Sequence, residues 1–204
     1  MARKQSDHDQ WRIDIAEAAC KVILENGLEG TRLKEIAAAM GYSVGVLQYY
    51  FTSKDELLLF AKNRLFDAKF DRMRAAAARR RGIDRLHAMA MELMPFSDED
   101  RAMFLLLSVF RGQAVGNPVL TARQTERDAT GSALFAEEIV ALQSSGHVRA
   151  DIDPGQQAVA LVGLLEGMAL QATALAAMGR TATSKLVRHY LSVILAAPKA
   201  GTPD

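Results

Sequence analysis

The sequence predicts an all-α protein of about nine helices. Half of its 204 residues are hydrophobic, and five are proline. Ala, Leu and Met, which favour helix over strand, recur along the whole chain. We find no segment in which apolar and polar residues alternate between turn signals, the pattern expected of a strand. The chain is long enough to bury a full hydrophobic core, in one large domain or two small ones.

The first predicted helix covers residues 9–26. Its inner stripe is formed by apolar residues at helical spacing, namely Ile13, Ala16, Cys20, Ile23 and Leu24. Asn26 and Gly27 end it. We expect the polar residues before it to be disordered in isolation, with Arg3 and Lys4 either in solvent or folded onto DNA phosphates.

Residues 31–51 are predicted to form two short helices joined by a tight turn. The first has an apolar stripe made of Leu33, Ile36, Ala37 and Met40, and the second buries Val44, Leu47 and Phe51. Gly41 ends the first helix. We expect the hydroxyls of Thr31 and Ser43 to cap the two helices. With the helix over 9–26 packed across them, they form a minimal helix-turn-helix domain, whose second helix suits the DNA major groove.

A long helix is predicted over residues 54–81. Ser53 and Glu56 form a capping box at its start. Lys54 gains nothing from the helix dipole there, so it calls for a partner outside the chain. A DNA phosphate is one such partner, and a plain surface lysine is the alternative. The second half of the helix is rich in cations, which we interpret as a solvated face: Lys69, Arg72, Arg74, Arg79, Arg80 and Arg81.

Five further helices are predicted over residues 84–94, 97–115, 119–145, 155–178 and 181–196. The second of these is apolar nearly all round at 103–110, which predicts a helix central to a core. The last two carry apolar residues together with small residues that would allow another helix to approach closely. They are Val159, Val162, Leu165, Leu170, Ala160, Gly163, Gly167, Ala174, Leu186, Val187, Tyr190, Leu191 and Ile194. We expect a homodimer through a four-helix contact, with packing on the chain's own core as the alternative.

Three segments follow from this layout. Residues 1–53 are predicted to be a DNA-binding domain, 54–197 a helical effector-binding and dimerisation domain, and 198–204 a disordered tail. The net charge is +1, and residues 1–60 carry seven basic and nine acidic side chains. Any DNA footprint must therefore be a local patch. The acidic balance keeps open a second function, a helical small-ligand-binding or adaptor protein without DNA binding.

Several functional classes are disfavoured. There is no Gly-rich phosphate loop and no nucleophile motif, and the histidines lack metal-ligand spacing, so we predict no enzyme activity, no catalytic residues, no metal and no cofactor. Cys20 is the one cysteine, which excludes an intrachain disulfide framework and favours a buried structural thiol. We find neither a secretory signal nor an uncharged stretch of membrane-spanning length, and predict a cytoplasmic protein without membrane contact.

Residues 31–57 resemble the TetR (tetracycline repressor) family of bacterial regulators. The likeness is carried by Gly41-Tyr42-Ser43-Val44-Gly45-Val46-Leu47-Gln48-Tyr49-Tyr50-Phe51 and by Ser53-Lys54-Asp55-Glu56-Leu57. Residues 165–168 give a weaker likeness to the betaine-regulator-like branch. The family usually reads Tyr-Tyr-His-Phe where this chain has residues 48–51, a change that bears on sequence preference more than on DNA binding.

The resemblance implies a DNA-binding surface made of Thr31, Ser43, Val44, Gly45, Gln48, Tyr49, Tyr50 and Lys54. Tyr49 and Lys54 would hold phosphates, and Val44, Gly45 and Gln48 would face bases. The chemistry agrees, because a Gln amide pairs with adenine and a valine contacts the thymine methyl. For both tyrosines, packing in the core is the alternative. The partner would be double-stranded DNA with a near-palindromic operator, released when a small-molecule effector binds a repressor dimer.

The resemblance also implies an effector site in the later helices. Its candidates are Met89, Met103, Phe104, Phe110, Arg111, Gln113, Glu166 and Gln171. Met and Phe can line an apolar pocket, although a plain core uses the same residues. Arg111 and Glu166 interrupt apolar surfaces, and they either pair with each other or meet the ligand.

Overall fold

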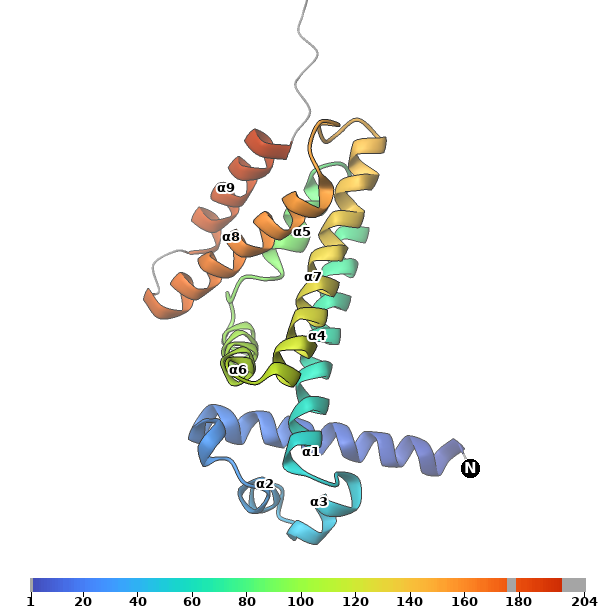
Figure 1. Cartoon of the computed structure of the whole chain (residues 1–204), viewed down its shortest axis with the longest axis vertical. Helices are drawn as coiled ribbons and strands as arrows, with labels where there is room; N and C mark the ends of the chain where they lie inside the picture. The colour runs from blue at the N-terminus through green and yellow to red at the C-terminus, as the bar shows by residue number, and fades with distance from the viewer. Residues whose placement is uncertain (1, 176–178, 196–204) are drawn as a thin grey trace, which may run out of the picture. The chain divides into compact units, whose positions relative to one another are not determined.

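A computed structural model of the chain describes residues 2–175 and 179–195. Within these residues the protein is all-α, as predicted (Figure 1). The helices are α1 (Ala2–Gly30), α2 (Leu33–Met40), α3 (Val44–Tyr50), α4 (Lys54–Ala78), α5 (Asp84–Met91), α6 (Asp98–Ala114), α7 (Pro118–Ser144), α8 (Pro154–Leu175) and α9 (Arg180–Tyr190), followed by a π-helical turn (Leu191–Leu195). The predicted tail, 198–204, lies outside the described residues.

The chain forms two compact units. The first contains the described residues up to Asp67 together with Ala102–Val115, and the second contains Ala68–Arg101 and the described residues from Gly116 onward. Helices α4 and α6 each contribute to both units. The predicted boundary at residues 53 and 54 stays a prediction.

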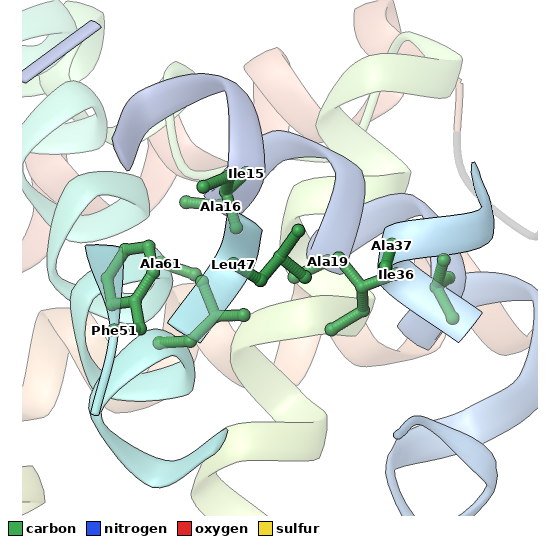
Figure 2. Close-up of a cluster of buried hydrophobic side chains, with 10 residues drawn as sticks. Ile15, Ala16, Ala19, Ile36, Ala37, Leu47, Phe51 and Ala61 are labelled. Carbon is green, nitrogen blue, oxygen red and sulfur yellow. The ribbon is translucent and has the colours of Figure 1, made fainter. Parts of the chain in front are cut away.

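The core of the first unit joins α1, α2 and α3 to the start of α4. Figure 2 shows Ile15, Ala16 and Ala19 of α1 facing the side chains of α2, α3 and α4, here Ile36, Ala37, Leu47, Phe51 and Ala61. All of these side chains are at most 3% exposed. Helices α2 and α3 both pack on α1 and on each other, so the predicted helix-turn-helix arrangement is present.

Helix α1 differs from the prediction in its start and in its buried face. It begins at Ala2 and not near residue 9, because the polar segment contains no Gly or Pro to stop a helix. Ile15, Ala19 and Val22 are buried, whereas Leu24, expected inside, is 41% exposed. The predicted end is a break at Gly27, whose φ of 70° and ψ of 169° are not helical. Only glycine adopts such angles without strain.

A second buried cluster in this unit joins Ile23 and Leu58 to Leu106 and Phe110 of α6. The half-buried Cys20 packs beside it, and burial raises the pKa of its thiol to about 11, with Glu17 adding to the effect. The predicted structural thiol is consistent with this environment. Helix α6, however, is not buried all round as expected: Leu105 is 44% exposed, so the helix buries one stripe.

The second unit is built on α7, which packs against α5 and α8, while α9 packs on α5. Its core includes Leu86 of α5, Phe135 and Ile139 of α7 and Leu161 of α8, none of them exposed. Three further residues, expected in a dimer contact, are instead at most 1% exposed inside this unit, because they lie on the inner faces of their helices: Leu165, Val187 and Leu191.

Ion pairs join the helices of the second unit. The Arg85 guanidinium of α5 holds the carboxylate of Glu138 on α7, with Nη2 and Oε2 2.9 Å apart. Arg72 of α4 donates to Glu92 at 2.9 Å and to Asp100 at 2.7 Å. The carboxylates of Glu138 and Asp100 each accept two hydrogen bonds or more, the geometry in which a partly buried charge is tolerated.

Helix ends in the second unit follow the capping residues of the sequence. The Asn117 side chain accepts hydrogen bonds from the amides of Val119 and Leu120, and Ser97 accepts one from Asp100. Three ends come three or more residues earlier than predicted: α4 at Ala78, α5 at Met91 and α9 at Tyr190. The predicted end of the helix over 155–178 lies outside the described residues, and α8 is described to Leu175.

Candidate nucleic-acid interface

The turn between α2 and α3 is set by Gly41. Its φ of 73° lies in the left-handed region, and its amide donates to the carbonyl of Ala38 at 3.1 Å. The next amide, that of Tyr42, donates to the carbonyl of Ala37 at 2.9 Å. These bonds satisfy carbonyls that the end of a helix leaves open. The turn therefore fixes the direction in which α3 leaves α2.

Helix α3 has a buried side and an exposed side. Leu47 is not exposed at all, and Val44 packs partly buried against the same core. Ser43, Gly45 and Gln48 are exposed, and Tyr49 is 71% exposed. The structure thus brings most of the predicted DNA-binding residues together on one surface of α3.

The two predicted hydroxyl caps are not formed. Thr31 is completely buried, and its hydroxyl donates to the carbonyl of Gly27 at 2.7 Å, an acceptor that the break in α1 makes available. Arg32 takes the N-cap position of α2 instead. Ser43 does occupy the N-cap position of α3, but its side chain makes no capping hydrogen bond. Thr31 presents no surface to DNA, and we leave it out of the interface proposed below.

Tyr50 belongs to an aromatic cluster at the surface of the first unit, made of His8, Trp11, Tyr42, Tyr49 and Tyr50. Its ring stacks on the Trp11 indole at 5.7 Å and 15°, and Tyr49 meets it edge-on at 5.0 Å. Burial raises the pKa of the Tyr50 phenol, with Tyr49 and Asp7 adding to the effect. For Tyr50 the packing alternative therefore describes the structure, whereas Tyr49 keeps most of its surface.

Lys54 has a partner inside the chain, contrary to the expectation of an outside one. Its half-buried ammonium donates to the main-chain carbonyl of Leu28 at 3.0 Å. This carbonyl lies just beyond the break in α1 at Gly27. The ammonium has three donors, so this bond leaves it able to donate to a phosphate as well.

The start of α4 is capped as predicted and is also clamped by a residue that the sequence analysis did not single out. The Ser53 hydroxyl accepts from the Glu56 amide at 3.1 Å. The Glu56 carboxylate accepts from the Thr52 amide and hydroxyl, both at 2.8 Å, and from Arg12 at 2.9 Å. These hydrogen bonds, led by that of the Thr52 amide, lower the pKa of Glu56 although partial burial acts against them.

The guanidinium of Arg12 also lies over two aromatic rings, 4.4 Å from the Phe51 centroid and 4.8 Å from that of Phe60. In the sequence, Arg12 is visible only as a cation on the polar face of α1. The residues around it do not indicate which side chains it contacts. Arg12 thereby ties α1 to the end of α3 and the start of α4.

The predicted effector residues are divided between the two units. Met103, Phe104, Phe110, Arg111 and Gln113 are in the first, and Met89, Glu166 and Gln171 are in the second. Met89 and Phe110 are buried, whereas Gln113 and Gln171 are exposed. Neither unit alone gathers the set, and these assignments stay predictions.

The second unit does contain a cleft that the sequence analysis did not predict. The cleft, which we call the α4–α5–α9 cleft, has a volume of about 600 Å³ and is lined in part by Arg79, Arg80, His87, Glu92, Arg180 and Lys185. Charge runs are common on solvated helices, so the sequence alone gave no reason to place these cations together.

The described residues form neither a metal-ligand cluster nor a membrane-spanning helix. No group of three or more His, Cys, Asp or Glu is placed to share a metal ion there. No helix in that part of the chain combines the length and apolarity needed to cross a bilayer.

Both ends of the chain match known families. Residues 15–60, which include α2 and α3, match the family described as "Bacterial regulatory proteins, tetR family". Residues 82–196 match the description "BetI-type transcriptional repressor, C-terminal". The first match supports the predicted family, and the second supports the predicted betaine-regulator-like branch.

Named relatives extend over most of the chain. The HTH-type transcriptional regulator PksA of Bacillus subtilis (strain 168) is 31% identical over 173 residues, which are 83% of this chain and 82% of that protein. The regulator UidR of Escherichia coli (strain K12) is 23% identical over 171 residues, 82% of this chain and 84% of that one.

Solved structures share the fold. A protein assigned as a transcriptional regulator from Saccharomonospora viridis, in complex with choline, has a TM-score of 0.82 and 22% identity, covering 93% of this chain and 100% of that one. One assigned to the TetR family from Rhodococcus sp. has a TM-score of 0.79 and 23% identity, covering 91% and 98%. At these identities the likeness establishes the fold alone.

Proposed function

Because this chain belongs to the TetR family of bacterial transcriptional regulators, we propose that it is a repressor whose α3 reads an operator and whose later helices bind the small molecule that releases it. The observation that carries the proposal is the outer surface of α3, where Ser43, Gly45, Gln48 and Tyr49 are exposed while Leu47 anchors the helix in the core. Members of this family are transcriptional regulators, and we propose no catalytic activity.

The proposed base contacts are made by Val44, Gly45 and Gln48. A Gln amide can pair with the N6 and N7 edge of adenine, and Val44 can contact a thymine methyl. At Gly45 a side chain would meet no atom closer than the Ser43 hydroxyl, at 3.7 Å, so the glycine is not required by packing. We propose that it lets the backbone of α3 approach the groove closely.

The proposed phosphate contacts are made by Ser43, Tyr49 and Lys54. The Ser43 hydroxyl, which makes no cap, is available to donate, and Tyr49 has the exposure that a phosphate contact needs. The bond from Lys54 to Leu28 would hold the ammonium in place for a phosphate. Tyr50 is proposed to position Tyr49 through their edge-on contact.

We propose a homodimer through α8 and α9. Val159 and Leu170 of α8 and Leu186 of α9 are between 42% and 63% exposed, an apolar surface that a partner helix would cover. Side chains at Gly163 and Gly167 would meet no atom within 4 Å, so this face of α8 is open. Two copies would present two α3 helices to half-sites about 34 to 36 Å apart.

The effector is proposed to bind among the later helices, in keeping with the family match over residues 82–196. The fold-related protein from Saccharomonospora viridis holds choline. A cation of that kind would need a carboxylate or an aromatic ring, and Glu166 is our candidate carboxylate. Binding that favours a conformer with misplaced α3 helices would lower operator affinity by linkage.

The proposal is tested by mobility-shift titrations with DNA from upstream of the protein's own gene and with a scrambled duplex. We expect tight, salt-dependent binding to the first. Gln48→Ala should lower the preference between the two DNAs by about 1 to 3 kcal/mol. Gln156→Ala, which removes an exposed amide from α8, is the matched control and should change nothing.

Lys54→Ala should weaken binding to both DNAs alike and lower the salt slope by about 1. Equal affinity of the wild type for both DNAs would refute a sequence-reading role for α3. Absence of salt-dependent binding to either would favour a helical ligand-binding protein without DNA binding.

A further inference from the structure

All lining residues of the α4–α5–α9 cleft belong to the second unit. Its walls come from the end of α4, from α5 and from the start of α9. A volume of about 600 Å³ is in the range of small-molecule sites. The cleft therefore has room for a metabolite rather than for a single ion.

The charge of the lining is one-sided. Arg79, Arg80, Arg180 and Lys185 contribute four cations. Among the residues that the structure describes, no carboxylate forms an ion pair with any of the four. Four like charges around one cleft repel one another, a cost that an anion would remove.

The acidic side chain of the lining does not balance them. Glu92 accepts a hydrogen bond from Arg72 Nε at 2.9 Å, so its charge is already paired. The nearby Asp84 is likewise held by Arg188. The cleft thus keeps an excess of positive charge after its own ion pairs are formed.

The neutral groups of the cleft suit an anion as well. His87 is within hydrogen-bond distance of the Ser184 hydroxyl, 3.0 Å away, and burial together with Arg188 lowers its pKa, so the imidazole is neutral near pH 7. Thr181 and Ser184 offer hydroxyls, and α9 begins here without a side-chain cap, so the amides of its first turn are open. These donors add to the four cations.

The rest of the lining is apolar and small, and it includes Ala76, Ala88 and Met91. The described lining of the cleft offers a cationic ligand such as choline neither a Phe, Tyr or Trp ring nor an unpaired carboxylate. A ligand with two or more negative charges and a short carbon skeleton fits both parts of the lining.

We propose that the α4–α5–α9 cleft is a binding site for a small organic anion with at least two negative charges, carried by phosphate or carboxylate groups. Arg80, which follows the end of α4, and Lys185 of α9 would hold it. The site goes beyond the proposed DNA-binding function, and its occupation can be measured without DNA.

The test is calorimetric titration of the full chain with pyrophosphate and, separately, with citrate at low ionic strength. We expect at least one probe to bind saturably with one site per chain. Tighter binding of pyrophosphate would indicate a phosphate ligand, and tighter binding of citrate a carboxylate ligand. The double variant Arg80→Gln/Lys185→Gln should weaken that binding by about a hundredfold, because each of the two lost ionic hydrogen bonds accounts for roughly a factor of ten.

The matched control is Arg81→Gln/Arg123→Gln, which removes two exposed charges of the same unit from outside the cleft. It should stay within about twofold of the wild type, since neither side chain lines the cleft. Thermal unfolding checks that both variants fold, and Lys185→Gln alone serves as a milder variant. No saturable binding of either probe, or equal weakening in both double variants, would overturn the site.

Discussion

Arg12 and Glu56 form an ion pair with Nη2 and Oε1 2.9 Å apart, although 44 positions separate them in the chain. Because the pair is half-buried and Arg12 also covers the Phe51 ring, we expect Arg12→Ala to lower the free energy of unfolding by about 1 to 2 kcal/mol. Urea denaturation measures this. Arg32→Ala, which removes an exposed cation at the start of α2, should cost less than about 0.5 kcal/mol. Equal losses of unfolding free energy in Arg12→Ala and Arg32→Ala would show that the Arg12–Glu56 pair adds no stability.

The pH dependence of stability should carry a contribution from Glu56. Its pKa is lowered from the ordinary value of 4.5, chiefly by the hydrogen bond from the Thr52 amide. The stabilisation is therefore complete above about pH 4.5 and is lost as pH falls through the lower pKa of the folded state. The difference in unfolding free energy between the wild type and Glu56→Gln should shrink as pH is lowered from 7 to 3.

Thr52→Val separates the two donors of this site, because it removes the hydroxyl and keeps the amide. The free energy of unfolding of Thr52→Val should therefore still depend on pH where Glu56 titrates, by part of the amount seen in the wild type. If the difference between the wild type and Glu56→Gln is constant over that pH range, the carboxylate is not the titrating group.

Two glycines with left-handed backbone angles should respond differently to alanine. Gly146 has a φ of 73° and open space around it. Gly146→Ala should lower the free energy of unfolding by about 1 to 2 kcal/mol, the cost of placing a residue with a Cβ in this backbone conformation. Gly82→Ala, at a φ of 53°, should lower the free energy of unfolding by more, because the added Cβ would come within 2.9 Å of the His147 ring. In a His147→Ala background the excess should disappear. Equal losses at the two positions in thermal unfolding would contradict the contact.

The proposed dimer makes a prediction about α8. Leu170→Asp should place a charge in the contact between copies and raise the dimer dissociation constant by at least about a hundredfold, roughly 3 kcal/mol. Val140→Asp is the control, since Val140 is 50% exposed on α7, outside the proposed contact. Sedimentation velocity would show a monomer for the first variant and a dimer for the second. A wild-type protein that sediments as a monomer would refute the proposed homodimer.

Local sequence patterns were enough for the helix-turn-helix. Gly41 ends α2, Ser53 caps α4, and the helical spacing of Ile36, Ala37 and Leu47 identifies the buried side of α2 and α3. Each of these signals acts within a few residues, so no knowledge of the rest of the chain is needed. The family resemblance then selected residues of α3 that the structure leaves exposed, and their contact with DNA stays a prediction.

The errors concern groups whose partners are distant in sequence or freed by an unusual backbone. Thr31 and Lys54 both find carbonyls at the break in α1, at Gly27 and Leu28. No pattern around residue 54 indicates an acceptor 26 positions earlier. The same limit hid Arg12 and the cations of the α4–α5–α9 cleft, which separate helices bring together only in the folded chain.

The aromatic cluster has a spectroscopic consequence. Trp11 is the one tryptophan in the sequence, and its indole lies 5.7 Å from the Tyr50 ring of α3 and 5.0 Å from Tyr42 in the preceding turn. The native chain therefore carries an intrinsic emission probe placed beside the proposed reading helix and nowhere else. Excitation of the indole reports the environment of α3 without any label, so rearrangement of that helix can be followed in real time in the unmodified protein.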